Sequence, residues 1–243
     1  MFRRLILAVA VCALMNGLRL AADEPKPAAK VNEAERLFRQ MEEKLSKAPT
    51  IEFVIETKYP KLADRKATLL LAEGNKMRLE GEVMDDGKRF RWLCVSDGTK
   101  LVTVNGAGER HENDFPKALN QEVVKVLTYG GGIQALHLHV IDVPYRSDAE
   151  TRRFADRLRA SGFTLGKKEK VNGRAAQVIE YEVSLEGQEG AYCALTVWID
   201  TKTHLPLRHT SSDKKGGELH ATETYTKITL GGKIDEKKFK LPK

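Results

Sequence analysis

The chain has 243 residues, of which 41% are apolar and 31% are charged, with 19 Gly, eight Pro and three Cys. An apolar fraction of this size excludes a disordered chain of low hydrophobicity, and the modest numbers of Gly, Pro and Cys exclude collagen-like and disulfide-dense scaffolds. The formal net charge of +7 comes from 41 basic and 34 acidic residues that are interleaved, which excludes a basic patch that follows a nucleic-acid backbone.

Residues 1–22 have the pattern of a secretory signal peptide, in which a basic start precedes an apolar run over residues 5–15 and two alanines precede a cleavage point after Ala22. The run is shorter than the about 20 apolar residues of a membrane-spanning helix. Cleavage removes three arginines, so that 38 basic and 34 acidic residues remain, and it delivers the chain to the periplasm. Retention as an uncleaved anchor is the alternative. Lipid attachment at Cys12 is disfavoured because a branched valine precedes it.

Order is expected to begin after a mobile leader over residues 23–31, and a single domain is expected over residues 32–243. Asn32 is placed to cap a helix that ends near Ala48 and Pro49. Apolar residues at spacings of three and four draw one stripe on this helix, which must therefore lie on another element. The stripe consists of Leu37, Phe38, Met41 and Leu45.

After this helix the apolar period changes from about 3.6 to 2, which is typical of strands that are buried on one face. Turn signals such as Asp86-Gly87 separate five short strands. These are expected over residues 50–59, 67–72, 76–83, 89–95 and 101–104.

The middle third of the chain predicts two further helices, over Phe115 to Tyr129 and over Asp148 to Ala160, with Gly162 just past the end of the second. The glycines at 130–132 are a candidate hinge. A second series of strands follows, over residues 163–170, 174–185, 191–199, 205–211 and 219–230.

This order predicts an α+β fold that is mainly β. We expect a strongly curved antiparallel sheet, an incomplete barrel, with about three helices covering its concave apolar face.

Residues that could carry chemistry are few. His137 and His139 would share one side of a strand and could bind a metal ion, but the other histidines lack ligand-like spacing, so two polar-tipped residues near a surface suffice as an explanation. Cys94 and Cys193 could pair, although two separate buried thiols are the favoured interpretation. No nucleophile or phosphate-binding motif occurs. We therefore expect no catalytic residue, no metal and no cofactor.

Alternate residues of a strand point to opposite faces of the sheet, and on each expected strand one of the two sets is more apolar. Ten residues of these more apolar sets should share one side of the sheet, and this side is the candidate binding face. It consists of Phe53, Ile55, Met77, Leu79, Phe90, Trp92, Ile179, Tyr181, Leu195 and Val197. These residues are either core beneath the helices or the lining of a space for an apolar ligand. Periodicity alone does not distinguish the two.

Several motifs resemble those of the LolA-like superfamily of outer-membrane lipoprotein carriers. They are Val95 to Leu101, Val171 to Arg174, Thr196 to Asp200, Leu205 to Arg208 and the closing Ile234 to Phe239. The resemblance extends from about residue 32 onward. It implies a curved, incomplete antiparallel barrel whose concave apolar surface, capped by helices, accepts the acyl chains of lipoproteins.

From the residues and this resemblance together we expect a non-enzymatic periplasmic binding protein for lipid acyl chains or lipoproteins, with a role in sorting lipoproteins to the outer membrane. Each methylene moved from water into an apolar site gains about 0.8 kcal/mol. Envelope proteins are further expected partners, nucleic acid is not, and the chain is expected to be a monomer. The alternative is an envelope interaction or sensor module on the same scaffold without lipid cargo.

Overall fold

The computed structural model describes residues 32–114, 158–185, 193–213 and 215–242. They form one α-helix, α1 (Glu33–Ser46), eleven strands and a short 3-10 helix, η1 (Glu236–Phe239). The strands are β1 Thr50–Lys58, β2 Arg65–Ala72, β3 Lys76–Asp85, β4 Lys88–Asp97, β5 Lys100–Val104, β6 Arg110–Asp114, β7 Leu158–Val171, β8 Arg174–Leu185, β9 Cys193–Asp200, β10 Pro206–Ser212 and β11 Leu219–Leu230. Within these ranges no helix has the length and apolarity needed to cross a membrane.

Helix α1 forms as its sequence predicts. The side chain of Asn32 accepts a hydrogen bond of 2.7 Å from the backbone amide of Glu35, which satisfies one of the free donors of the first turn. The stripe is confirmed, because Phe38, Met41 and Leu45 are fully buried and Leu37 is partly buried against them.

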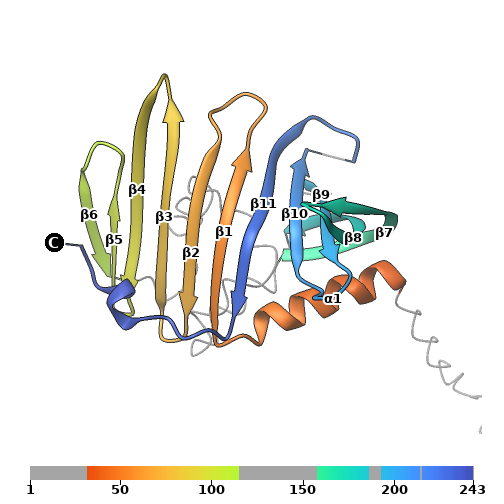
Figure 1. Ribbon diagram of the computed structural model, residues 1–243, viewed down its shortest axis with the longest axis horizontal. Helices are drawn as coiled ribbons and strands as arrows, with labels where there is room; N and C mark the ends of the chain where they lie inside the picture. The colour runs from red at the N-terminus through yellow and green to blue at the C-terminus, as the bar shows by residue number, and fades with distance from the viewer. Residues whose placement is uncertain (1–31, 115–157, 186–192, 214, 243) are drawn as a thin grey trace, which may run out of the picture. The chain divides into compact units, whose positions relative to one another are not determined.

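All eleven strands belong to one antiparallel sheet with the order β6-β5-β4-β3-β2-β1-β11-β10-β9-β8-β7 (Figure 1). Two meanders, β1–β6 and β7–β11, are joined because the first strand pairs with the last, with Ile51 opposite Leu230 and Lys58 opposite Thr222. Among the described strands, β6 and β7 are the two edges and do not pair with each other. The predicted open antiparallel sheet is therefore confirmed.

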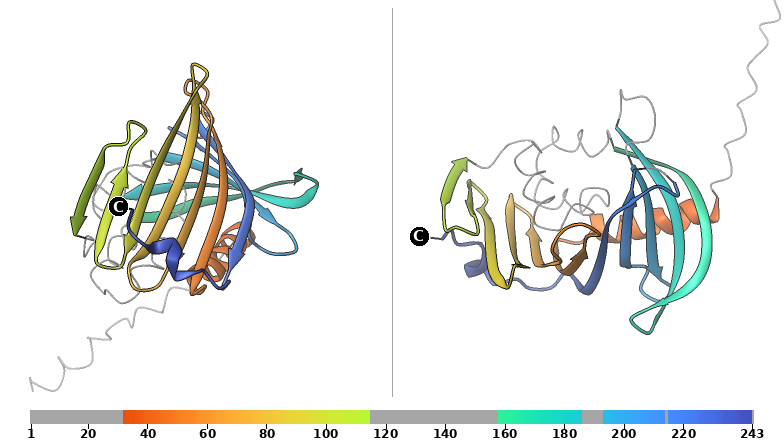
Figure 2. Two further views of the ribbon diagram at one scale, coloured as in Figure 1. Left: turned by 60° about the vertical axis from the view of Figure 1, so that its left-hand side comes forward. Right: turned by 90° about the horizontal axis from the view of Figure 1, so that it is seen from above.

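The sheet bends, and Figure 2 shows the β7–β10 end turning away from the line of β2–β5. Irregularities of pairing lie in this half and at the joint between the meanders. Register shifts occur between Val54 and Ile55 in β1, between Ser211 and Ser212 in β10, and at two places in β7. Bulges of this kind increase the local twist and bend a strand, which gives the curvature.

The expectation of about three helices is wrong for the described residues, which contain one α-helix. The helix expected over Phe115 to Tyr129 and the glycines at 130–132 lie outside these residues. The helix expected to end at Ala160 is corrected at that end, because Leu158 to Ala160 already belong to β7 and pair with Val183 to Leu185 of β8. Pairing with β8 outweighs the local helix signals.

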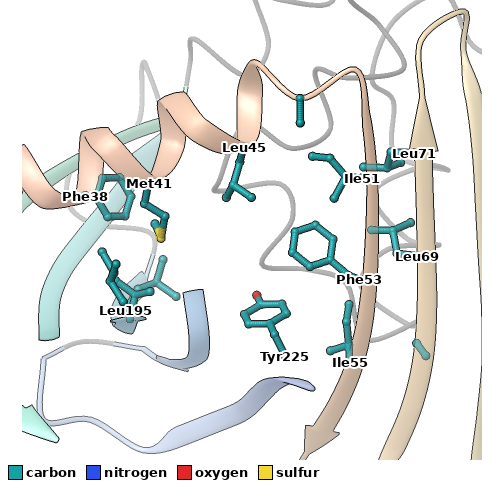
Figure 3. Close-up of a cluster of buried hydrophobic side chains, with 14 of the residues drawn as sticks. Phe38, Met41, Leu45, Ile51, Phe53, Ile55, Leu69, Leu71, Leu195 and Tyr225 are labelled. Atoms are coloured by element: carbon teal, nitrogen blue, oxygen red, sulfur yellow. The ribbon is translucent and has the colours of Figure 1, made fainter. Parts of the chain in front are cut away.

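The main core, called here the apolar cluster, lies on one face of the sheet and includes the buried side of α1. Figure 3 shows Phe38, Met41 and Leu45 pointing from the helix towards Phe53, Leu195 and Tyr225 of the sheet. Aromatic contacts tie the helix to the second meander, with ring centroids 4.5 Å apart for Phe38 and Tyr181 and 5.0 Å apart for Phe38 and Phe163.

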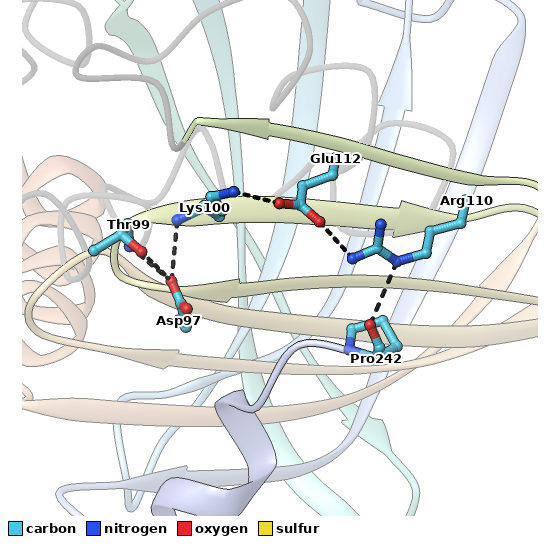
Figure 4. Close-up of polar contacts among 6 residues, drawn as sticks. All are labelled: Asp97, Thr99, Lys100, Arg110, Glu112 and Pro242. Carbon is cyan, nitrogen blue, oxygen red and sulfur yellow. Dashed lines mark hydrogen bonds and ion pairs between the residues drawn. The ribbon is translucent and has the colours of Figure 1, made fainter.

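The opposite face of β2–β4 is covered by the C-terminal segment. Phe239 of η1 is buried against Leu70 and Ala72. Figure 4 shows the last contact of this segment, in which Arg110 of β6 donates a hydrogen bond to the carbonyl of Pro242 and also pairs with Glu112. The segment therefore holds the edge of the first meander.

Two turns at one end of the sheet are closed by carboxylates. In the β9–β10 turn, Asp200 accepts hydrogen bonds from the amides of Lys202 (2.8 Å) and Thr203 (2.7 Å) and from Nε of Arg174 (2.8 Å). Burial raises the pKa of Asp200, but the two amide hydrogen bonds and the charge of Arg174 outweigh this effect, so its pKa lies below its usual range. Asp97 closes the β4–β5 turn in the same way through Thr99 and Lys100 (Figure 4).

Replacing Asp200 by asparagine should lower the free energy of unfolding by about 1–3 kcal/mol at pH 7, because a buried charge-assisted network is lost. A carboxylate whose folded-state pKa is lowered stabilises the fold above its unfolded-state pKa of about 3.9, and this stability disappears as the pH falls through the folded-state value. Urea unfolding of both proteins should therefore converge in acid. The exposed Asp213→Asn is the control, with a change of less than about 0.5 kcal/mol. A difference that does not vary with pH would contradict the assignment.

Candidate ligand-binding face

Eight of the ten residues of the candidate binding face lie together in the apolar cluster. Each has an exposed fraction of 2% or less, and they come from β1, β3, β8 and β9. They are Phe53, Ile55, Met77, Leu79, Ile179, Tyr181, Leu195 and Val197.

Strand register brings these residues together. In the first meander, Leu79 lies opposite both Leu69 of β2 and Cys94 of β4. In the second meander, Tyr181 lies opposite Leu195. The two meanders meet where Ile55 faces Tyr225 across β1 and β11.

The sheet side of the cluster has further members that the candidate face left out, among them Leu69, Leu71, Leu101 and Tyr225. Leu69, Leu71 and Leu101 could have been found, because they hold the inward parity of strands that the sequence predicted. In β11 the buried residues Ala221, Glu223 and Tyr225 alternate with partly buried ones, so Tyr225 also faces inward.

Phe90 and Trp92 are not part of the apolar cluster. They face the same side of the sheet as Cys94 of β4 but lie nearer the start of the strand. There Phe90 is 38% exposed and Trp92 is half-buried. The Trp92 ring crosses Gly81 so closely that a Cβ at position 81 would stand 2.2 Å from it. The guanidinium of Arg65 lies 6.0 Å from the Trp92 ring and 5.0 Å from the Tyr59 ring. This end of the face is thus aromatic and cationic rather than purely apolar.

A chain of buried polar groups crosses the apolar cluster. The hydroxyl of Tyr181 lies 3.2 Å from Nε2 of His209, Nδ1 of His209 lies 3.2 Å from the hydroxyl of Tyr225, and that hydroxyl donates to Glu223 at 3.3 Å. His209 and Glu223 are fully buried. Burial raises the pKa of Tyr181 and, together with the Glu223 charge, that of Tyr225, so both phenols remain protonated at neutral pH.

No pattern in the sequence indicates this chain of polar groups. A histidine and a glutamate inside strands look like solvent-facing residues when each strand is considered alone. Their partners, Tyr181 and Tyr225, come from two different strands, and only the register of β8, β10 and β11 brings the four residues together.

The titratable groups of the described residues do not form a metal site. No three His, Cys, Asp or Glu side chains gather in these ranges as metal ligands would. His137 and His139 lie outside the described residues. Cys94 and Cys193 are separate buried thiols, as favoured from the sequence. Burial raises the pKa of Cys94 to about 12 and that of Cys193 to about 11, so both are thiols at neutral pH.

Two recesses are lined mainly by residues that point to the face of the sheet opposite the apolar cluster. One, of about 290 Å³, is lined mainly by charged and small residues, including Glu180, Glu182 and Thr196, and it also touches Tyr181 and Leu195. The other, of about 310 Å³, is lined by Lys66, Glu80 and their neighbours. Both linings carry ion pairs or polar groups, which distinguishes them from the apolar cluster.

A comparison with family sequence models gives no match, and neither does a comparison with curated proteins. Solved structures are similar. The complex of MucA and MucB from Pseudomonas aeruginosa aligns with 87% of this chain and 62% of that chain, at 13% identity and a TM-score of 0.42. The lipoprotein LppX from Mycobacterium tuberculosis aligns with 82% of this chain and 96% of that chain, at 11% identity and a TM-score of 0.44.

A LolA superfamily protein from Nitrosomonas europaea aligns with 86% of this chain and 97% of that chain, at 11% identity and a TM-score of 0.32. The superfamily named for the sequence motifs is thus also found among the similar structures. The chain spans less than two thirds of the length of the MucB structures.

Proposed function

We propose that the chain is a non-enzymatic binding protein that holds the acyl chains of lipids or lipoproteins against the apolar face of its sheet. One observation carries the proposal: apolar residues from both meanders, such as Phe53, Leu79 and Val197, form one continuous buried cluster on one face of a sheet whose edge strands, β6 and β7, do not pair with each other among the described strands.

Acyl binding on this face requires part of the cluster to open, because its residues are buried. Each methylene of the ligand that leaves water contributes about 0.8 kcal/mol to binding. The side-chain contacts that are lost when the cluster opens are replaced by contacts with the equally apolar ligand. We place this activity in the periplasm, on the basis of the signal peptide pattern of residues 1–22, and we propose a monomer. Sorting of lipoproteins to the outer membrane is the pathway that fits such a carrier.

The test is a titration of the purified chain with a fatty acid that carries an environment-sensitive fluorophore. Saturable binding, reversed by an unlabelled fatty acid, is expected, and lipid extracted from the purified protein should be detectable by mass spectrometry. Trp92→Ala, at the half-buried end of the face, should weaken binding several-fold. Trp198→Ala, on the opposite face beside Val171 and Leu207, is the matched control. No saturable binding to the folded protein would refute the proposal.

The second candidate is an envelope interaction or sensor module without lipid cargo. It is favoured by the burial of the cluster and by β6 and β7, which are the two edges of the sheet among the described strands. Crosslinking in cells should then trap one specific protein. Reversing the exposed charges of Lys168 and Lys170 on β7 should abolish that crosslink while leaving the fold intact.

A further inference from the structure

The two edges of the sheet are engaged differently by the rest of the chain. At the β6 edge, Glu112 pairs with both Lys100 and Arg110. Arg110 also donates a hydrogen bond to the carbonyl of Pro242 in the C-terminal segment. The other edge, β7, is the longest of the described strands, with 14 residues, and among them it pairs only with β8. An edge strand carries backbone N–H and C=O groups that no strand of its own sheet pairs.

Side chains of helix α1 contact the backbone of the first half of β7. Asn32, which caps the helix, donates a hydrogen bond of 3.0 Å to the carbonyl of Phe163. Arg39 donates one of 3.3 Å to the carbonyl of Ala160, and its guanidinium carbon lies 5.4 Å from the centroid of the Phe163 ring. The helix therefore engages the first half of this edge.

The second half of β7, residues 164–171, is called here the open edge. Within the described ranges, one side chain donates a hydrogen bond to its backbone, because Gln177 bonds the carbonyl of Gly166 at 2.6 Å. Gln177 belongs to β8, so this bond joins two strands that are already paired. Leu165 in this stretch is 46% exposed. Such a stretch can accept a further strand, whose affinity comes from main-chain hydrogen bonds.

Three lysines of the open edge are exposed and carry unpaired charges. Lys167, Lys168 and Lys170 form no ion pair with the described residues. Lys168 and Lys170 lie opposite Gln177 and Ala175 in a stretch where the pairing with β8 is regular. They are two residues apart, so their side chains point to the same face of the sheet.

The carboxylates around these lysines have other partners. Glu169 points to the opposite face, where it accepts a hydrogen bond of 2.8 Å from the indole N–H of Trp198. The carboxylates of β8 and β9 beside the open edge are in ion pairs, Glu180 with Lys215 and Asp200 with Arg174. The open edge therefore holds three unpaired positive charges against one carboxylate.

We propose that the open edge binds an extended acidic segment of a partner protein, which adds to the sheet as a further strand. Side chains directly opposite each other on paired strands are about 4.5–5.5 Å apart, and opposite charges there are stabilising. A segment with acidic residues at alternate positions therefore places one carboxylate opposite Lys168 and another opposite Lys170.

A second copy of the chain fits this edge less well. Pairing of two β7 strands brings the lysines of both copies together, and like charges on paired strands are destabilising. Exposed lysines thus protect an edge from its own kind, while they attract an acidic strand. The inference is independent of acyl binding to the apolar cluster, and for the second candidate function it specifies the chemistry of the partner.

The experiment is a titration of a fluorescent peptide of about ten residues, alternating glutamate and threonine, with the full chain, followed by anisotropy. Saturable binding is expected, and it should weaken as salt is added. Lys168→Glu together with Lys170→Glu should weaken binding about tenfold or more. A peptide of the same sequence with N-methylated amides keeps its charge but has no main-chain donors, and it should lose binding to a similar extent. Amide hydrogen exchange in residues 164–170 should slow when the unmodified peptide is bound.

Lys237→Glu together with Lys238→Glu is the matched control, because it reverses two exposed lysines of η1 and changes the net charge equally. It should bind the peptide like the wild type, and circular dichroism should show that both variants are folded. The proposal is overturned if the folded wild type does not bind the peptide, if the control loses as much binding, or if the N-methylated peptide binds equally well. It is also overturned if the chain sediments as a dimer that the β7 variant dissociates, since a second copy then occupies the edge. A fluorescent fatty acid should bind both variants unchanged, which separates this test from that of the proposed function.

Discussion

Replacing Phe38 by alanine should lower the free energy of unfolding by about 3–5 kcal/mol. Phe38 is fully buried, and its ring contacts Tyr181 and Phe163, which belong to the second meander. The substitution removes the apolar area of the ring and leaves a cavity between α1 and the sheet. It also removes the ring beneath the guanidinium of Arg39, whose carbon lies 5.6 Å from the centroid. Urea unfolding followed by circular dichroism measures the change.

Leu37→Ala provides the control for this prediction, because Leu37 neighbours Phe38 on the same helix and is only partly buried. Its cost should be less than half that of Phe38→Ala. Equal costs for the two variants would contradict the assignment of the loss to the buried contacts of Phe38 with the sheet.

Replacing His209 by phenylalanine should cost about 2–4 kcal/mol, because two buried hydroxyls lose a hydrogen-bond partner. The hydroxyl of Tyr181 loses the imidazole with which it makes its hydrogen bond, and the hydroxyl of Tyr225 loses one of two partners. Both hydroxyls lie in fully buried side chains, where a donor without a partner is expensive. Equilibrium unfolding in urea gives the loss.

A double-mutant cycle with Tyr181→Phe tests the cause of this loss. Because Tyr181→Phe removes the hydroxyl that His209→Phe leaves without a partner, the double variant should be more stable than the sum of the single losses predicts. Strictly additive losses would show that the hydrogen bond between the two side chains contributes nothing to stability.

Local periodicity was sufficient to place most of the sheet. The bounds expected for β8 (Arg174–Leu185) and β11 (Leu219–Leu230) agree with the structure, because inward and outward positions alternate along both strands and glycine or turn residues bound them. The helix stripe containing Phe38 was equally clear. In these segments, burial on one face and local propensity favour the same structure.

Gly162 shows why one boundary was wrong. It has a positive φ of 66°, which is typical of a glycine that ends a helix, and this was the basis for a helix ending at Ala160. The same conformation also suits a bulge, and Gly162 lies within the register shift between Ser161 and Thr164 of β7. A local conformation was predicted correctly, while the choice between helix and strand depends on pairing with β8.

Strand β6 was missed because its sequence has no alternation. All five residues, Arg110–Asp114, are exposed and mostly charged. The strand exists because it pairs with β5, with Lys100 and Glu112 forming an ion pair across the two strands (Figure 4). The polar chain through His209 and Glu223 was missed for a related reason, since Tyr181 and His209 are 28 residues apart and meet only through strand pairing.

For the candidate binding face, the side of the sheet that each residue occupies was predictable. How far burial extends along that side was not. Phe90 and Trp92 follow the same alternation as Cys94, which is buried, yet they lie outside the apolar cluster. Periodicity reports which side of the sheet a residue occupies. How far along that side the burial extends depends on the elements that lie over it.

Contact quenching by a brominated fatty acid tests the acyl-binding face most directly. Trp92 lies on the same side of the sheet as the proposed binding face, and Trp198 lies on the opposite side. In Trp198→Phe the remaining indole is Trp92, and its fluorescence should be quenched saturably by the monomeric fatty acid. In Trp92→Phe the remaining indole is Trp198, and its fluorescence should not change. Equal quenching of both variants, or quenching of neither, would contradict acyl-chain binding on the apolar face.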